Sequence, residues 1–202
     1  MDVETLGVFG GTFDPIHCGH LVAAEEARVR LNLREVIFAP ATIPPHKVGE
    51  VITPIEHRLA MIRLAIASNP HFTLSLVDVN RPGPAYTVDS IHLLQEEWGP
   101  EVKIYFIMGL DSLEEILTWH RPELLIQSCH LAVVNRPGHN ADLSTLENSL
   151  PGLSRRVTFV PMPQLDISST DLQRRVREGR SIKYLVPEAV EAYIHSHGLY
   201  LS

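Results

Sequence analysis

The stretch 10–20, with the sequence Gly-Gly-Thr-Phe-Asp-Pro-Ile-His-Cys-Gly-His, constrains the fold more than any other part of the chain. It follows the apolar run 6–9 and precedes a predicted helix that begins near Gly19. A strand, a glycine turn and a helix in this order place backbone N–H groups and a helix N-terminus at the end of a strand. Such a site binds an anion, usually a phosphate. His17 and His20 lie in the turn and at the start of the helix, so we expect both imidazoles in one pocket.

Apolar runs alternate with segments of helical periodicity along most of the chain. Several runs are continuous rather than alternating, as expected for strands that are covered on both faces. The predicted strands are Leu6–Phe9, Val36–Ala39, Phe72–Val77, Val102–Met108, Leu131–Val134 and Val157–Val160. The alternation predicts an α/β fold with a doubly wound parallel sheet and right-handed crossovers.

Local signals predict where the helices begin. Residues 53–56 match a capping box with proline at the first helical position. Further helices are expected over Val88–Trp98, Leu113–Ser128 and Ser168–Gly179, and after residues 186–188. The part after Val160 is interpreted as a small helical C-terminal subdomain, about residues 163–202, within a single domain that spans residues 1–202.

The composition excludes several classes of protein. A net charge of -7 disfavours a nucleic-acid partner that is held by general electrostatics. The N-terminus lacks the pattern of a signal peptide and no apolar run is long enough to span a membrane, so a cytoplasmic protein is expected. Cys18 and Cys129 form no metal or disulfide pattern and fit a reducing compartment.

Several common phosphate and catalytic motifs are absent. The chain has no G-x-G-x-x-G fingerprint, no Walker-type phosphate loop, no H-E-x-x-H and no nucleophile elbow. His17 and His20 are spaced so that they could bind zinc, but no further ligand lies nearby in the sequence. They could be structural, or they could donate hydrogen bonds to phosphoryl oxygens in a transition state.

The segment 167–175 begins another predicted helix. Ser168 and Asp171 match a capping box, which is the structural interpretation. The three hydroxyl residues 168–170 at a helix N-terminus also suit a second anion site. Arg174 lies four residues after Thr170, on the same face of the helix.

Other loops carry side chains that suit nucleotides. Lys47 ends a proline-rich loop, and Thr87 ends the loop 81–87. Asp111 follows a glycine at a strand end, a position that often binds a ribose hydroxyl. Trp119 offers a flat face for stacking, and Arg136 follows another strand.

The residues 10–15, the H-x-G-H motif at 17–20 and the Ile-Ser-Ser-Thr segment at 167–170 together closely resemble the H-x-G-H nucleotidyltransferase superfamily. With the segments 44–47, 83–87 and 109–111 and with Trp119, nearly the whole chain resembles the bacterial nicotinate-nucleotide adenylyltransferases. The resemblance implies a Rossmann-like nucleotidyltransferase fold. It also implies transfer of the adenylyl group of ATP to nicotinate mononucleotide, which gives deamido-NAD and pyrophosphate in NAD biosynthesis.

The resemblance also implies roles for individual residues. The catalytic charge stabilisers are His17, His20, Lys47 and Arg174. The ATP-binding residues are Gly10, Gly11, Thr12, Phe13, Ser168, Ser169 and Thr170. The mononucleotide-binding residues are Tyr86, Thr87, Gly109, Asp111, Trp119 and Arg136. Mg²⁺ is expected to bind through the phosphates of ATP rather than through protein ligands, and the sequence leaves a homo-oligomer open.

The chain departs from the family pattern at three positions. Gln173 stands where the family usually has an arginine, and Arg174 is taken as its substitute. Ala85 replaces a serine, and Asp78 replaces a glutamate. The motifs leave open a relative that acts on nicotinamide mononucleotide, phosphopantetheine or a cytidylyl acceptor. They also leave open a non-catalytic nucleotide-binding module on the same fold.

Overall fold

The computed structural model describes residues 4–43, 51–81, 83–99, 101–135 and 142–201. Within them, one sheet holds six strands in the order β3-β2-β1-β4-β5-β6, and every neighbouring pair is parallel. The strands are β1 (Thr5–Gly11), β2 (Glu35–Pro40), β3 (Phe72–Leu74), β4 (Lys103–Gly109), β5 (His130–Asn135) and β6 (Val157–Pro161). The predicted doubly wound α/β fold is confirmed.

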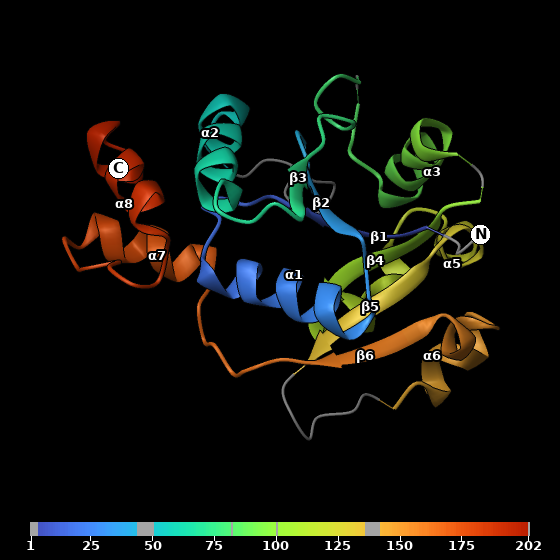
Figure 1. The fold of residues 1–202 in the computed structure, drawn as a ribbon. Helices are drawn as coiled ribbons and strands as arrows, with labels where there is room; N and C mark the ends of the chain where they lie inside the picture. The colour runs from blue at the N-terminus through green and yellow to red at the C-terminus, as the bar shows by residue number, and fades with distance from the viewer. Residues whose placement is uncertain (1–3, 44–50, 82, 100, 136–141, 202) are drawn as a thin grey trace.

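Helices cover both faces of this sheet (Figure 1). One face packs against α1 (Cys18–Arg30), α2 (Ile55–Ile66), α7 (Ser169–Arg177) and α8 (Glu188–Ser196). The other face packs against α3 (Thr87–Trp98), α4 (Leu110–Glu114), α5 (Pro122–Ser128) and α6 (Ser144–Ser149). Short 3₁₀ turns lie at Ile116–Thr118 and Leu153–Arg155. Among the described residues, no helix is long and apolar enough to cross a bilayer.

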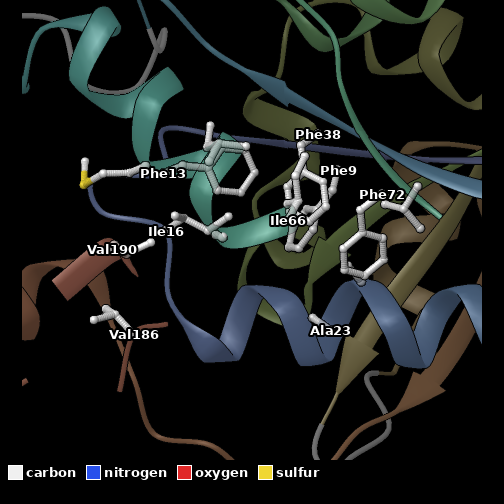
Figure 2. Close-up of a cluster of buried hydrophobic side chains, with 14 of the residues drawn as sticks. Phe9, Phe13, Ile16, Ala23, Phe38, Ile66, Phe72, Val186 and Val190 are labelled. Atoms are coloured by element: carbon white, nitrogen blue, oxygen red, sulfur yellow. The ribbon is translucent and has the colours of Figure 1, made fainter. Parts of the chain in front are cut away.

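Alternate residues of β1 supply the two cores. Leu6 and Val8 are buried on the α3 side, whereas Phe9 is buried on the α1 side. A ring cluster of Phe9, Phe13 and Phe38 lies on the α1 side (Figure 2). Alternation of this kind places successive side chains on opposite faces of the sheet. The central strand is therefore fixed by burial on both sides.

Most predicted elements agree with the structure to within one or two residues at each end, and two differ by more. The third strand ends at Leu74 rather than Val77, and residues 76–80 form a turn in which the Val79 N–H donates to the Leu76 carbonyl. The single helix predicted over 113–128 is wrong, since α4, a 3₁₀ turn and α5 replace it. The chain breaks at Arg121, which has a φ of 50°, and at Pro122, which cannot continue a preceding helix.

The capping box predicted at residues 53–56 is also wrong. Pro54 is the N-cap of α2, and no side chain caps the helix. Thr53 instead donates its backbone N–H to Asp14 and accepts a hydrogen bond from Arg58 at its carbonyl. Helices α7 and α8 share the core of α1 and α2, and the boundary of a C-terminal subdomain near residue 163 stays a prediction.

Candidate active site

A cleft of about 1240 Å³ opens at the carboxyl ends of the central strands. It lies where the strand order reverses, between β1 and β4, which is the usual position of ligands in open parallel sheets. Gly10 and Gly11 of β1, Gly109 of β4 and Asn135 of β5 line it. Helices α1 and α7 point their first turns toward it, since His17 and Ser168, the two N-caps, are also lining residues.

His17 and His20 lie together in this cleft, as predicted from their spacing. Their rings stack with centroids 3.7 Å apart and an interplanar angle of 25°. A Cβ added to Gly19 would lie 3.0 Å from Nδ1 of His17, so any larger residue between the histidines would press on the His17 ring. The H-x-G-H spacing therefore gives one helix turn two stacked imidazoles.

The hydrogen bonds of His20 assign its tautomer. The backbone N–H of His17 donates to Nδ1 of His20 over 3.2 Å, so the proton of a neutral His20 ring is on Nε2. Burial, and secondarily the adjacent His17, hold the pKa of His20 well below its usual range. His20 is thus a neutral N–H donor at physiological pH, which suits a site that receives developing negative charge.

His17 is also neutral in this environment. Burial lowers its pKa from 6.5 to about 4, and its side chain is only 6% exposed. Its Nδ1 atom is buried and has no hydrogen-bond partner among the described residues. Bringing a phosphate anion next to this ring would favour its protonated form.

The loop that carries His17 is held by segments far along the chain. We call residues 10–17 the histidine turn. Asp14 accepts hydrogen bonds from the N–H of Thr53 (3.0 Å), the hydroxyl of Tyr200 (2.6 Å) and Nε2 of Gln173 (2.6 Å). Asp14 is only 5% exposed, and buried polar groups are costly unless they are paired.

Arg58 fixes the same turn from another side. Arg58 is 1% exposed, and within the described part of the chain its guanidinium donates only to backbone carbonyls, namely those of Thr12, Ala41, Thr42 and Thr53. Burial lowers its pKa from the ordinary arginine value. In the sequence Arg58 looks like one polar position of an amphipathic helix, so its pattern does not predict this role.

Of the three hydroxyl residues 168–170 at the start of α7, Ser168 alone lines the cleft. Ser168 lines the cleft, and its oxygen accepts the N–H of Asp171. Ser169 donates its hydroxyl to the carbonyl of Pro15 over 2.9 Å, whereas Thr170 is exposed and does not line the cleft. The predicted cap at Ser168 is confirmed, but Ser169 here supports the turn.

Two other predicted site residues lie away from the cleft. Arg174 pairs with Asp171 at the surface and is not a lining residue, because its side chain leaves α7 on the solvent side. Phe13 is 2% exposed, with a φ of 51°, and its ring packs against Phe9 and Phe38 rather than facing a ligand. Both side chains lie outside the cleft, and their expected roles toward ATP stay predictions.

The β4 side of the cleft collects most of the predicted mononucleotide residues. Five of them line it, namely Tyr86, Thr87, Gly109, Asp111 and Trp119. The predicted residues Lys47 and Arg136 lie outside the described residues.

A hydrogen-bond network that the sequence motifs did not predict holds Tyr86. Ser90 donates to both carboxylate oxygens of Asp78 (2.8 Å each), and Arg81 donates to the same carboxylate over 2.9 Å. The carbonyl of Tyr86 accepts from Ser90 over 3.1 Å. The three-residue spacing of Asp78 and Arg81 was the one feature of the sequence that could have predicted their ion pair.

His120 and Arg121 also line the cleft and were missed. The His120 ring stacks on Tyr86 with centroids 4.1 Å apart. Arg121 is the one lysine or arginine among the described residues that line the cleft. Its left-handed backbone begins α5, and strained residues of this kind cluster at functional sites.

Comparisons with known proteins agree with this geometry. Residues 8–175 match the family model described as cytidylyltransferase-like. A protein of Thermomicrobium roseum named a probable nicotinate-nucleotide adenylyltransferase is 52% identical, over 98% of this chain and 92% of its own. One of Moorella thermoacetica with the same name is 48% identical, over 96% and 91%.

The fold is also similar to solved structures. A Plasmodium falciparum nicotinic acid mononucleotide adenylyltransferase complexed with NaAD matches with a TM-score of 0.79 at 20% identity, over 98% of this chain and 97% of that one. The same enzyme complexed with APC matches with a TM-score of 0.77 at 21% identity, with the same coverage. At these identities the likeness supports the fold.

Proposed function

Because this chain belongs to the nicotinate-nucleotide adenylyltransferase family, it is a nucleotidyltransferase of NAD biosynthesis, and we propose that its cleft between β1 and β4 carries out the transfer. The enzyme joins the adenylyl group of ATP to nicotinate mononucleotide and releases pyrophosphate. The observation that carries the site proposal is the stacked pair of His17 and His20 in the cleft, at the end of the central strand.

The two sides of the cleft would bind different substrates. The ATP phosphates would lie over Gly10, Gly11 and Thr12 and at the first turn of α7, where backbone N–H groups favour anions. The mononucleotide would lie on the β4 side, with its ring near Trp119. Phosphate contacts by Lys47, Thr170 and Arg174 stay predictions, and so does a contact of Arg136 with the mononucleotide.

The chemistry needs alignment more than activation. An oxygen of the mononucleotide 5′-phosphate attacks the α-phosphorus of ATP, the bond to the β-phosphate breaks, and pyrophosphate leaves. This phosphate is ionised at neutral pH, so no protein base is required. Nε2–H of His20 would donate to an oxygen of the reacting phosphoryl group, where one such donor is worth about 3 kcal/mol. His17 would become cationic as negative charge builds up beside it.

The carboxylates of the cleft suit a Mg²⁺ ion that is held mainly by the substrate phosphates rather than by the protein. Asp78 is committed to Ser90 and Arg81, and the described residues contain no group of three metal-binding side chains. Asp111 is a lining carboxylate that could meet the hydrated ion or a ribose hydroxyl. When bound, Mg²⁺ would neutralise phosphate charge during transfer. We also propose that the enzyme works in the cytoplasm, which two free cysteines support.

A direct assay tests the proposal. The purified chain is mixed with ATP, Mg²⁺ and either nicotinate or nicotinamide mononucleotide, and the dinucleotide product is quantified. We expect product with both ATP and the acid, and higher kcat/KM for the acid than for the amide. Equal or higher efficiency with the amide would reject the acceptor, and product with neither would reject the site.

A further inference from the structure

Each oxygen of Asp14 accepts a hydrogen bond from a segment far away in the sequence. The carboxylate accepts from Tyr200 and Thr53, and the backbone carbonyl accepts from Gln173. We propose that Tyr200 and Gln173 are positioning residues for the histidine turn and act on catalysis through Asp14. The expected effect on turnover rests on the proposed function. The anchoring of the histidine turn by Tyr200 and Gln173 does not depend on it.

The Tyr200 contact is short and lies in a dry environment. The hydroxyl donates over 2.6 Å to one carboxylate oxygen of Asp14, and the N–H of Thr53 donates over 3.0 Å to the other. Burial, and secondarily the adjacent carboxylate, raise the pKa of Tyr200, so the hydroxyl keeps the proton that it donates. Removing this hydroxyl would leave a buried carboxylate oxygen without its donor, which is costly.

The Gln173 contact joins the two predicted phosphate sites. Its amide donates over 2.6 Å to the Asp14 carbonyl, and Ser169 of the same helix donates to the next carbonyl, that of Pro15. The family's arginine is replaced here by a neutral side chain that reaches the turn. Because Ser168 at the start of this helix lines the cleft, these bonds fix α7 relative to the histidine turn.

Packing supports the same linkage. Ile16 of the turn is fully buried in a core cluster with Val186 and Val190, which belong to the segment that leads to Tyr200 (Figure 2). Only one residue separates Ile16 from Cys18, whose N–H donates to the Leu185 carbonyl. A turn that loses its polar anchors would stay attached at Ile16 but could rotate about it. Such a rotation would move His17 and the backbone of residues 10–12, and displacements near 1 Å cost about 10²-fold in rate.

The test compares Tyr200→Phe with Tyr193→Phe. Tyr193 lies on α8, and its hydroxyl contacts His57 of α2 rather than the turn. Each variant loses one hydroxyl that bonds a partner far away in the sequence. Amide hydrogen exchange of peptides that cover residues 10–20 should be at least fivefold faster in Tyr200→Phe than in wild type and unchanged in Tyr193→Phe. Equal exchange in the two variants would overturn the proposal.

Turnover gives the second readout. We expect kcat to fall about tenfold in Tyr200→Phe while KM changes less than about twofold, because alignment rather than binding is lost. Gln173→Met, which keeps the volume but lacks the donor, should give the same pattern if Tyr200→Phe does not fold. The double variant should lose less than the product of the two single effects, since both act on Asp14.

The two proposals fail in distinguishable ways. A wild-type chain without adenylyl transfer would reject the function, and hydrogen exchange would still decide the role of Tyr200. The wild type could instead be active while Tyr200→Phe and Gln173→Met have the same kcat as Tyr193→Phe. That result would reject the positioning role and leave the proposed function intact. Faster exchange at residues 10–20 with a selective loss of kcat supports it.

Discussion

The two sides of the cleft are held by contacts of very different range. The histidine turn is anchored by side chains and backbone groups 39 to 186 residues away along the chain. On the β4 side, the hydrogen bonds of Asp78, Arg81 and Ser90 with one another and with the Tyr86 carbonyl join residues only 3 to 12 apart, and the longer contact of the Thr42 hydroxyl with the Asp78 carbonyl spans 36 residues. Under the proposed function, the reacting phosphates would meet a turn that is fixed through the whole fold. The acceptor would be met by locally built loops.

The largest effect is expected at the turn. His20→Ala should lower kcat about 10²- to 10³-fold, because it removes a donor to the transition state. Its melting temperature should change little compared with this loss. Steady-state kinetics and thermal melting measure both, and the exposed His71→Ala serves as the control. A loss of folding without a specific defect in kcat would assign His20 a structural role and remove the contrast between the two sides.

The stability of the turn should depend on pH through His17. Its pKa is about 4 in the folded chain and about 6.5 in the unfolded chain, so the unfolded state binds more protons between these values. This histidine should leave stability unaffected above pH 6.5 and lower it as the pH falls toward 4, by about 2 kcal/mol at pH 5. Urea unfolding from pH 7.5 to 4.5 measures the slope.

The matched variant for that experiment is His17→Asn. It should show a smaller decrease than the wild type over the same pH range, whatever its starting stability. An identical slope in both proteins would mean that His17 is not held neutral in the fold.

A glycine on each side of the cleft gives a direct comparison. Gly19→Ala should lower kcat about tenfold, because its Cβ would lie 3.0 Å from Nδ1 of His17 and must displace the ring. A Cβ added to Gly109 would meet no atom within 4 Å among the described residues. Gly109→Ala should therefore keep kcat and raise KM for the mononucleotide. Equal kcat losses at the two sites would contradict the proposed division of the cleft.

The smallest effect is expected at Arg121. Arg121→Gln should raise KM for nicotinate mononucleotide about fivefold, since an exposed cation contributes about 1 kcal/mol toward an anionic partner. KM for nicotinamide mononucleotide, whose ring bears a neutral amide in place of the carboxylate, should change less. The control is Arg63→Gln, an exposed arginine of α2 that does not line the cleft. An equal rise for acid and amide would show that Arg121 does not read the pyridine carboxylate.

The sequence was informative where local pattern determines structure. Continuous apolar runs located the strands, and the parallel α/β arrangement followed from their alternation with helices. The H-x-G-H spacing placed His17 and His20 in one cleft, since both belong to one helix turn. The break at Arg121 and Pro122 was missed because apolar periodicity continues across it.

The contacts around Asp14 could not be predicted in the same way. Gln173 and Arg174 are neighbours on one amphipathic helix, and only the docking of α7 decides which of them faces the turn. Charge and family resemblance favoured Arg174 as a phosphate contact, which stays a prediction, whereas the docking of α7 turns the Gln173 amide toward the histidine turn. Arg58 was missed for a related reason, because its partners are carbonyl oxygens that leave no trace in the residue pattern.

The long-range anchoring of Asp14 has a consequence for protein synthesis. A ribosome makes the histidine turn early, but its partners Gln173 and Tyr200 follow 159 and 186 residues later. The nascent chain can form β1 and α1 long before the turn between them is fixed, and folding at the usual pace of translation is sequential from the N-terminus. A translation product that ends before residue 173 would thus lack both distant donors to Asp14 and, with them, an anchored phosphate site.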